Sequence, residues 1–146
     1  MFLFLGSFDY AMDERGRVPL PPSCREELRK GIVLSQGSPD RCLLVRSAAA
    51  FDAQASEYME ESPLLRKGRD MRLAFFSTSH PVELDSQHRI LIPAAMRAYA
   101  GLSGKVKLVG AGECLQIWAP DAYDARMDRI NETLEHTLET RERRDR

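Results

Sequence analysis

Residues 13–25 read DERGRVPLPPSCR, and residues 85–97, which lie 72 positions further along the chain, read DSQHRILIPAAMR. Nine of the 41 positions from 13 to 53 are identical to their counterparts at this offset, where ordinary composition would give about two or three. The matches continue downstream in a shared Cys-Leu pair and a shared Ala-(Phe/Tyr)-Asp-Ala segment. The chain therefore contains two related units.

The length of the chain suits two small units that share one core. With 146 residues and 43% hydrophobic content, each unit is too small to be more than marginally stable alone. We expect an α+β fold in one pseudo-twofold body. The predicted divisions are a first domain with its helix over 1–60, a connecting helix over 61–77, and a second domain with a C-terminal helix over 78–146.

Bulk charge does not indicate a nucleic-acid partner, because the formal net charge is -1 and the pI is near 6.3. Any such site must be local. Three cysteines, an odd number in or beside apolar stretches, favour a reducing compartment over a disulfide framework. The apolar start, residues 1–5, is too short to span a membrane and is expected to be a first strand. We therefore expect a cytoplasmic protein with no membrane partner.

Each copy of the repeat predicts a strand, a turn, a strand and a short helix. Alternating apolar residues over 8–12 and 18–20 flank the first turn, and 82–84 with 90–92 flank the second. Pro21 and Pro93 then stand where a short helix would begin. Its core-facing residues are predicted to be Cys24 and Leu28 in the first copy, and Met96 and Ala100 in the second.

Downstream, each unit predicts two more short strands and further helices. The strands are expected over 32–34 and 41–45, and over 105–109 and 115–118. A helix capped by Ser47 carries an apolar stripe of Phe51, Ala55, Tyr58 and Met59. A second helix is expected from Ser62-Pro63 to near Phe76, and a C-terminal helix from Pro120-Asp121. We expect the apolar side of that last helix, which includes Leu134 and Leu138, to pack on its own domain; a neighbouring chain is the alternative.

The first turn has residues that can stiffen a loop and present basic groups. Asp13 can accept backbone N–H bonds within the turn, and Gly16 supplies a positive φ without steric cost. Arg15 and Arg17 would then project from a rigid turn, able to reach phosphates and guanine edges with little ordering entropy left to lose. The alternative is that Asp13 and Arg17 form only a turn-stabilising ion pair.

The second turn repeats this pattern with two departures. Asp85 and Arg89 match the first copy, but His88 occupies the glycine position and Gln87 the position of the first arginine. Histidine is among the residues enriched at positive φ, so the turn can form with some strain. Two such turns side by side would make a small basic platform on an otherwise neutral protein.

These two Asp-x-x-(Gly/His)-Arg turns, each followed by an apolar strand and a Pro-x-x-x-Arg segment, resemble the MraZ family, whose chains carry two AbrB-type swapped-hairpin halves. The Ala100-Gly101-Leu102 and Leu115-Gln116-Ile117-Trp118 segments are similar as well, and the resemblance covers residues 1 to 135. It implies a pseudo-twofold swapped-hairpin β-barrel with flanking helices. It also implies a nucleoid-associated transcription regulator that assembles into homo-oligomeric rings. Such a regulator binds short direct repeats in double-stranded DNA upstream of its own operon, the cluster for division and cell-wall synthesis.

Carried over residue by residue, the resemblance implies roles for the turn residues. Arg15, Arg17 and Arg89 are expected to contact DNA. Gln87 and His88 depart from the family pattern, so the second turn is expected to bind more weakly or to contact bases differently. Asp13, Gly16 and Asp85 would shape the turns.

Arg25 and Arg97, which close the Pro-x-x-x-Arg segments, are candidates for phosphate contact. A structural ion pair is the alternative for both.

Other functions fit the sequence less well. We expect no enzyme, cofactor, metal site or small-molecule substrate, because the chain has no phosphate loop, dinucleotide fingerprint, nucleophile-elbow motif or zinc-type ligand spacing. The basic run at 66–72 predicts a solvated helix face or a subunit contact. Two rival functions remain: an antitoxin-like protein and a scaffold that uses the same fold. DNA contact by n arginines predicts an affinity that falls with log salt at a slope near -0.9n, whereas a scaffold predicts no such slope.

Overall fold

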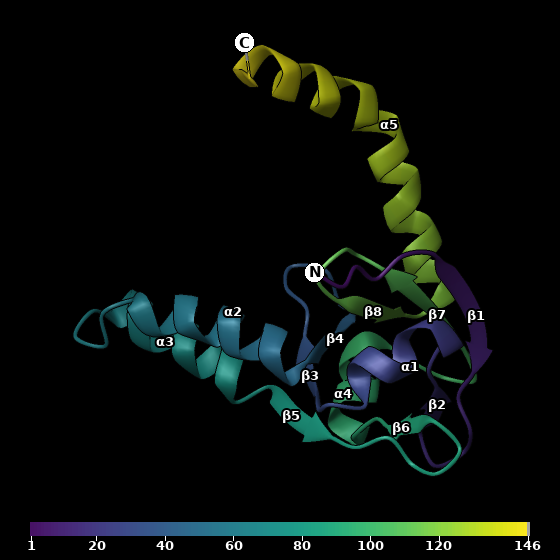
Figure 1. Cartoon of the computed structure of the whole chain (residues 1–146). Helices are drawn as coiled ribbons and strands as arrows, with labels where there is room; N and C mark the ends of the chain where they lie inside the picture. The colour runs from purple at the N-terminus through teal and green to yellow at the C-terminus, as the bar shows by residue number, and fades with distance from the viewer. Residues whose placement is uncertain (146) are drawn as a thin grey trace.

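A computed structural model describes residues 1–145 of the chain (Figure 1). In chain order its elements are β1 (Ser7–Ala11), β2 (Arg17–Pro19), α1 (Pro22–Leu28), β3 (Ile32–Gln36), β4 (Leu43–Ser47), α2 (Ala48–Glu60), α3 (Arg66–Phe76), β5 (Ser79–Val82), β6 (Arg89–Leu91), α4 (Ala94–Ala100), β7 (Lys105–Gly110), β8 (Leu115–Trp118) and α5 (Pro120–Asp145). The predicted α+β class is confirmed. The order β1-β2-α1-β3-β4-α2 recurs as β5-β6-α4-β7-β8-α5, and α3 lies between the two sets.

The two units exchange strands. β1 of the first unit pairs with β7 of the second, and β5 of the second pairs with β3 of the first, both antiparallel. β4 and β8 join the units in the middle of a six-stranded sheet of order β1-β7-β8-β4-β3-β5, while β2 and β6 form a separate two-stranded sheet. Each unit is therefore completed by strands of the other, as a swapped-hairpin fold requires.

The strand register locates the pseudo-twofold axis. Val18 in β2 lies opposite Ile90 in β6, and Leu44 in β4 lies opposite Gln116 in β8. Both pairs join residues that are 72 positions apart, so each residue faces its own counterpart in the other unit. The axis passes through both pairs, which confirms the duplication inferred from the repeat.

The core lies between the two sheets and the short helices α1 and α4. Both units contribute to it, and the largest of its side chains that are less than 2% exposed are Val18, Leu20, Leu28, Leu34, Leu43, Val45, Ile90, Ile92, Met96, Leu108, Leu115 and Ile117. Burial of this apolar surface is the main favourable term in folding. Because strands of both units line one core, neither unit has a complete core of its own.

The short helices begin where the prolines predict. Pro21 and Pro93 directly precede α1 and α4 with φ of -56° and -55°, angles that a pyrrolidine ring fixes and a helix start accepts. The four residues predicted to face the core are all buried: Cys24, Leu28, Met96 and Ala100.

Helices α2 and α3 lie side by side and project from the body (Figure 1). The predicted cap on α2 is confirmed, since the Ser47 hydroxyl accepts the backbone N–H of Ala50 at 3.2 Å. Phe75 of α3 is buried and stacks on Tyr58 and Phe51 of α2, with ring centroids 4.2 and 5.2 Å apart. These aromatic contacts hold the two helices together.

Two expectations for this hairpin are wrong. Met59 is 53% exposed rather than part of a buried stripe. Helix α3 begins at Arg66, because the Ser62 hydroxyl accepts the N–H of Leu64 and the Ser62 carbonyl accepts the N–H of Leu65, which forms a turn instead of a helix start. Leu64 and Leu65 are therefore left 86% and 63% exposed in the connection.

The basic run of α3 is mostly exposed, as expected of a solvated face or a subunit contact, since Arg66, Lys67 and Arg69 are exposed, but two of its arginines also contact the neighbouring backbone. Arg72 donates from Nη2 to the carbonyls of Met59 at 3.0 Å and Glu61 at 2.9 Å. Arg69 donates from Nη1 to the carbonyls of residues 63–64, both at 3.1 Å. A helix end leaves carbonyls without internal partners, and these two arginines satisfy carbonyls at the end of α2 and in the loop.

The C-terminal helix α5 extends much further than its packing does. Near its start Tyr123 contacts Trp118, with ring centroids 6.0 Å apart, but residues 131–145 are exposed and the helix runs away from the body (Figure 1). Leu134 and Leu138 are 42% and 51% exposed. The expectation that they pack on their own domain is wrong, because no element of residues 1–145 reaches them. The charged end remains helical to Asp145; Arg146 lies outside the described residues.

All three cysteines are buried and free. Burial raises the pKa of the Cys42 thiol to about 12, which makes the reactive thiolate scarce. Cys42 and Cys114 thus occupy apolar positions, as their places in the repeat predict. Among residues 1–145, no helix is both long enough and apolar enough to cross a membrane.

Candidate nucleic-acid interface

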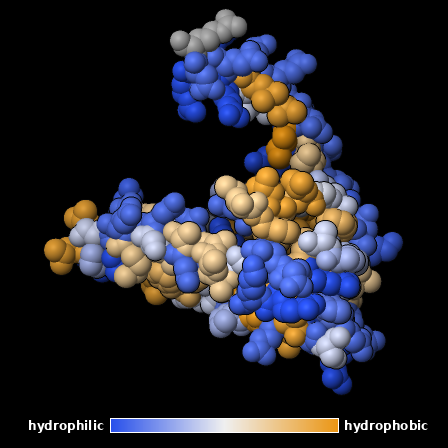
Figure 2. Space-filling view, viewed as in Figure 1, coloured by the Kyte–Doolittle hydropathy of each residue, from blue (hydrophilic) through white to orange (hydrophobic). Residues whose placement is uncertain are grey.

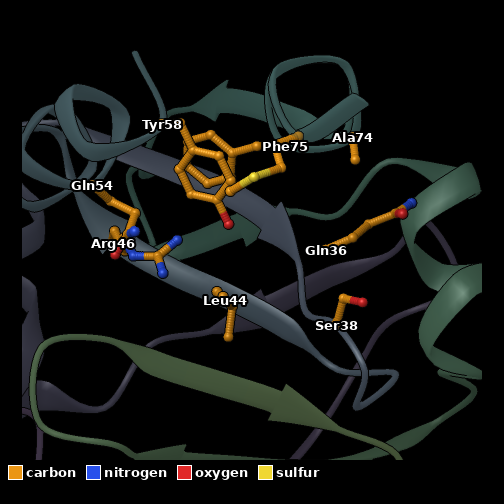
Figure 3. Close-up of a pocket in the computed structure, with 9 residues that line it drawn as sticks. Gln36, Ser38, Leu44, Arg46, Gln54, Tyr58, Ala74 and Phe75 are labelled. Atoms are coloured by element: carbon orange, nitrogen blue, oxygen red, sulfur yellow. The ribbon is translucent and has the colours of Figure 1, made fainter. Parts of the chain in front are cut away.

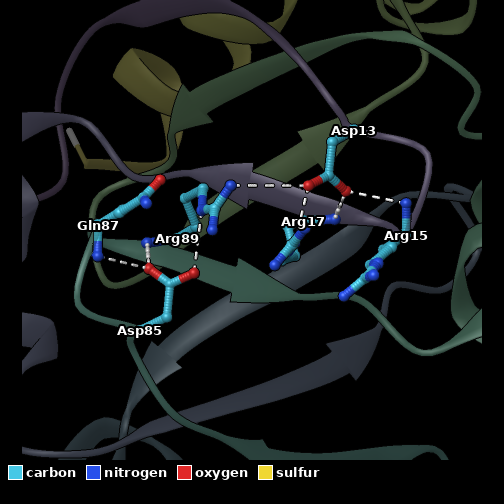
Figure 4. Close-up of polar contacts among 6 residues, drawn as sticks. All are labelled: Asp13, Arg15, Arg17, Asp85, Gln87 and Arg89. Atoms are coloured by element: carbon cyan, nitrogen blue, oxygen red, sulfur yellow. Dashed lines mark hydrogen bonds and ion pairs between the residues drawn. The ribbon is translucent and has the colours of Figure 1, made fainter.

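The first turn is a closed loop held by one carboxylate. Oδ1 of Asp13 accepts the backbone N–H groups of Arg15 at 3.0 Å and Arg17 at 2.8 Å, and Oδ2 accepts the Nε–H of Arg17 at 2.7 Å (Figure 4). The N–H of Gly16 donates to the Asp13 carbonyl at 3.0 Å, and the N–H of Asp13 to the Arg17 carbonyl at 3.0 Å. Both the backbone and the Arg17 side chain are therefore fixed.

The second turn matches the first bond for bond. Oδ1 of Asp85 accepts the N–H groups of Gln87 at 2.8 Å and Arg89 at 2.9 Å, and Oδ2 accepts the Nε–H of Arg89 at 2.9 Å (Figure 4). The N–H of His88 donates to the Asp85 carbonyl at 3.0 Å. Replacing glycine by histidine and arginine by glutamine has left this geometry intact.

The fourth residue of each turn has a positive φ, +92° at Gly16 and +60° at His88. A Cβ atom on Gly16 would lie 2.8 Å from Cζ of Arg97, so a side chain there would displace that guanidinium. The carbonyl of Gly16 accepts the N–H of Ile92 at 2.9 Å, and that of His88 accepts the N–H of Leu20 at 3.0 Å. These residues thus also join each turn to the opposite unit.

The two turns precede β2 and β6, so they lie at opposite ends of this antiparallel pair, on either side of the pseudo-twofold axis. Nη1 of Arg89 lies 3.7 Å from Oδ2 of Asp13, which connects the two carboxylate–arginine pairs (Figure 4). This contact across the axis was not among the interactions predicted from the sequence. The 72-residue repeat was the signal that could have indicated it. When equivalent residues of two copies pair across a twofold axis, the residues that flank them also come together.

Within the turns, the candidate residues fall into two groups. The side chains of Arg17 and Arg89 are 32% and 24% exposed and are held by carboxylates. Arg15 and Gln87 are exposed, and their side chains make no hydrogen bond or ion pair within residues 1–145. The turn-stabilising role left open by the sequence is therefore present, and the side chains free to reach a partner are those of positions 15 and 87.

The arginines of α1 and α4 are half-buried beside this platform. Arg25 donates from Nε to the carbonyl of Leu20 at 3.0 Å, and Arg97 lies over Gly16. Neither forms an ion pair with any other residue of the described chain.

The electrostatics of the platform are nearly balanced. Residues 13–17 contain two acidic and two basic side chains, and residues 85–89 contain one of each, so the surplus comes from Arg25 and Arg97. The pKa of Asp13 is lowered from 3.8 to about 2, chiefly because its carboxylate accepts the N–H of Arg17. The pKa of Asp85 is lowered chiefly by the N–H of Arg89. Both carboxylates stay charged at neutral pH, and any attraction for phosphate is weak per chain.

Comparison with known proteins identifies the family. The family described as "MraZ protein, putative antitoxin-like" matches the chain twice, over residues 3–71 and 75–145. A protein of Dehalococcoides mccartyi named "Transcriptional regulator MraZ" is 30% identical over 140 residues, which is 96% of this chain and 99% of the relative.

Two further relatives carry the same name. The Paenarthrobacter aurescens protein is 42% identical over 123 residues, covering 84% of this chain and 85% of the relative. The Mycoplasmoides gallisepticum protein is 33% identical over 137 residues, covering 91% and 96%. The doubled family match agrees with the exchanged strands and with the two braced turns, the loops at 13–17 and 85–89 that Asp13 and Asp85 hold closed. The chain therefore belongs to the MraZ family.

Proposed function

We propose that this chain is a transcriptional regulator that binds double-stranded DNA through its two braced turns. The name of its relatives supports the regulatory role. The observation that carries the DNA-binding surface is the matched pair of carboxylate-held turns across the pseudo-twofold axis. The backbone of both turns and the side chains of Arg17 and Arg89 are already held by hydrogen bonds, so binding would cost little further conformational entropy.

Each turn residue then has a distinct role. Arg15 reaches a phosphate or a guanine edge, and Gln87 can hydrogen-bond a base edge, as glutamine does with adenine. Arg17 and Arg89 offer their remaining N–H groups to the backbone of DNA. His88 contributes a ring at the place where the first turn has only glycine, so the two turns contact DNA unequally.

Arg25 and Arg97 complete the surface from the flanking helices. Within residues 1–145 their guanidiniums have no acidic partner, and they supply the small positive surplus of the surface formed by the two turns. We assign them to phosphate contact, where they would add affinity but no sequence preference.

A platform with so small a surplus needs repetition to hold an operator, and we propose that the chain assembles into a homo-oligomeric ring. Figure 2 shows apolar side chains at the tip of the α2–α3 hairpin and along α5; the exposed apolar residues there include Leu64, Leu65, Leu134 and Leu138. Solvent-exposed apolar clusters commonly mark interfaces. Linked platforms gain about 100-fold or more over a single one without new contacts.

The proposed targets are short direct repeats upstream of the chain's own operon, in the gene cluster for division and cell-wall synthesis, which would place the protein on the nucleoid. Fluorescence anisotropy with a labelled upstream fragment tests this. We expect saturable binding that weakens when one repeat is deleted. Equal affinity for a scrambled fragment of the same length would contradict it.

Arg17→Ala tests the role of the braced turns. We expect near-complete loss of operator binding, because the change removes both a basic group and its bond to Asp13. Light scattering should show unchanged assembly, since Arg17 begins β2, which belongs to the body rather than to the projecting α2–α3 tip or the projecting end of α5 (Figure 1). Unchanged DNA affinity in a normally assembled variant would contradict the assignment.

The family description favours one rival function, an antitoxin-like protein; a scaffold is the other. A scaffold would use the turns only for assembly, so its apparent DNA affinity would show no systematic fall with salt. An antitoxin would bind a partner protein through a segment such as the free part of α5. Removing residues 131–146 would then abolish partner binding while leaving DNA binding unchanged.

A further inference from the structure

Arg46 is a buried cation without a counter-charge. It lies on β4, is 7% exposed, and makes no side-chain hydrogen bond or ion pair with any described residue. Its Nη1 atom is shielded from solvent and has no partner within residues 1–145. An arginine cannot lose its proton in a protein, and an unpaired buried charge is costly. The site therefore favours an anion.

Arg46 faces a cavity of about 470 Å³ between β4, the β3–β4 connection and the α2–α3 hairpin. The polar residues on its wall include Ser38, Gln54 and Tyr58, and the apolar ones include Leu44 and Phe75. In Figure 3 the Arg46 guanidinium and the Tyr58 hydroxyl point toward the same space. This volume lies within the range of small-ligand sites, and the mixture of apolar walls with a few converging polar groups is typical of them.

The second unit contains the matching groove with its charge already compensated. At the 72-residue offset, Trp118 stands in the place of Arg46 and Arg126 in the place of Gln54, and both line the second groove. Nε of Arg126 donates to Oδ1 of Asp40 at 3.0 Å. The cation of the second groove thus has a carboxylate from within the chain, whereas the cation of the first has none.

We propose that the first groove binds a small organic carboxylate, with its carboxylate on Arg46 and its apolar part against Tyr58 and Phe75. A guanidinium matches a carboxylate bidentately. The single positive charge suits a monocarboxylate better than a doubly charged phosphate. Ser38, Gln54 and Tyr58 can donate to the remaining lone pairs. This site lies apart from the DNA-binding turns and goes beyond the proposed DNA-binding function.

A bound carboxylate would join β4 to the α2–α3 hairpin. The hairpin projects from the body, and no further strand or helix of residues 1–145 covers its outer end (Figure 1). Ligand that binds only the folded state raises the melting temperature by mass action. The occupied protein should therefore melt higher, with the gain lost when the Arg46 charge is removed.

Benzoate serves as the probe, with benzamide as its uncharged isostere and inorganic phosphate as the competing anion, all at constant ionic strength. We expect calorimetry and thermal melts of the full chain to detect benzoate and to give much weaker responses to the other two. Arg46→Trp, which copies the second unit, should weaken benzoate binding at least about tenfold. Arg46→Lys should retain part of the response.

Two further variants control for effects outside the first groove and for misfolding. Arg126→Met breaks the ion pair of the second groove and should leave the benzoate response unchanged. If Arg46→Trp does not fold, Arg46→Met replaces it, and the benzoate–benzamide comparison on the unaltered protein needs no variant.

The proposal is overturned if the unaltered protein ignores benzoate, if benzamide binds equally well, if phosphate binds in place of benzoate, or if loss of the Arg46 charge leaves the affinity unchanged. If instead benzoate has no effect and Arg46→Trp lowers the oligomeric mass, a carboxylate of a second copy occupies the groove. That result would also refute the small-ligand proposal.

Discussion

Substituting the fourth residue of each turn, His88→Gly in the second and Gly16→Ala in the first, tests the turn geometry. His88 has φ of +60°, inside the left-handed region that non-glycine residues can enter at a cost of about 1–2 kcal/mol. Glycine there would relieve this strain but would add about 0.5–1 kcal/mol of unfolded-state entropy. His88→Gly should therefore change the free energy of unfolding by between about zero and about +1 kcal/mol.

The matched change in the first turn should behave differently. Gly16 has φ of +92°, beyond the left-handed minimum, and a Cβ there would meet the guanidinium of Arg97. Backbone strain of this kind costs about 1–3 kcal/mol, and moving Arg97 adds to it. Gly16→Ala should therefore destabilise the protein by at least about 1–2 kcal/mol, although the residue lies in a matching loop.

Urea unfolding of both variants at constant protein concentration measures the difference. An unchanged m-value with a shifted midpoint reports stability alone. The reasoning is refuted if Gly16→Ala is as stable as the unaltered protein, or if His88→Gly loses more than about 1 kcal/mol, because either result would mean that the observed φ values do not govern these turns.

Three further predictions concern acid stability and packing. Because the pKa of Asp13 is lowered from 3.8 to about 2, its stabilising contribution is complete above pH 3.8 and is lost as the pH falls toward 2. Asp13→Asn should flatten urea midpoints across this window, and an unchanged pH dependence would contradict the carboxylate's role. Gly68→Ala should raise hydrogen exchange across α2 and α3 while the sheets stay protected, since a Cβ at this position would overlap the Ser62 carbonyl group; native protection in the hairpin would contradict this. Met96→Ala, at a position 1% exposed, should cost about 2–5 kcal/mol in urea unfolding, and a loss below about 1 kcal/mol would place Met96 outside the core.

The sequence predicted the elements that local chemistry determines. Pro21 and Pro93 marked the starts of two short helices, and Ser47 marked the N-terminal cap of α2. The repeated Asp and Arg residues predicted the closed turns. Each of these features depends on residues within a few positions of one another, so a single sequence contains the necessary information.

Features that depend on distant contacts were missed. The sequence around Leu134 does not indicate that α5 extends away from the body. An apolar stripe has the same sequence pattern whether it packs on its own domain or on another chain. The hydrogen bonds of Arg69 and Arg72 to backbone carbonyls were not predicted, because they depend on where the α2–α3 connection lies. The cavity at Arg46 was missed although the repeat aligns this arginine with Trp118, because burial of a lone strand residue depends on the hairpin that folds over it.

Substitution at position 15 tests the proposed binding of DNA by the braced turns most directly, because the equivalent position 87 is glutamine in an otherwise matching turn. Arg15→Gln makes the first turn like the second, Gln87→Arg does the reverse, and Arg129→Gln removes the same charge from an exposed position on α5. One phosphate contact contributes about 0.9 to the salt slope, or about a factor of five in affinity at about 0.15 M salt, per engaged chain.

The decisive measurement is therefore the salt dependence of operator affinity for the unaltered protein and these three variants, by fluorescence anisotropy. We expect Arg15→Gln to weaken binding and to reduce the slope by about 0.9 per engaged chain, Gln87→Arg to strengthen binding, and Arg129→Gln to match the unaltered protein. Equal slopes and affinities for all four proteins would contradict the claim that the braced turns hold DNA.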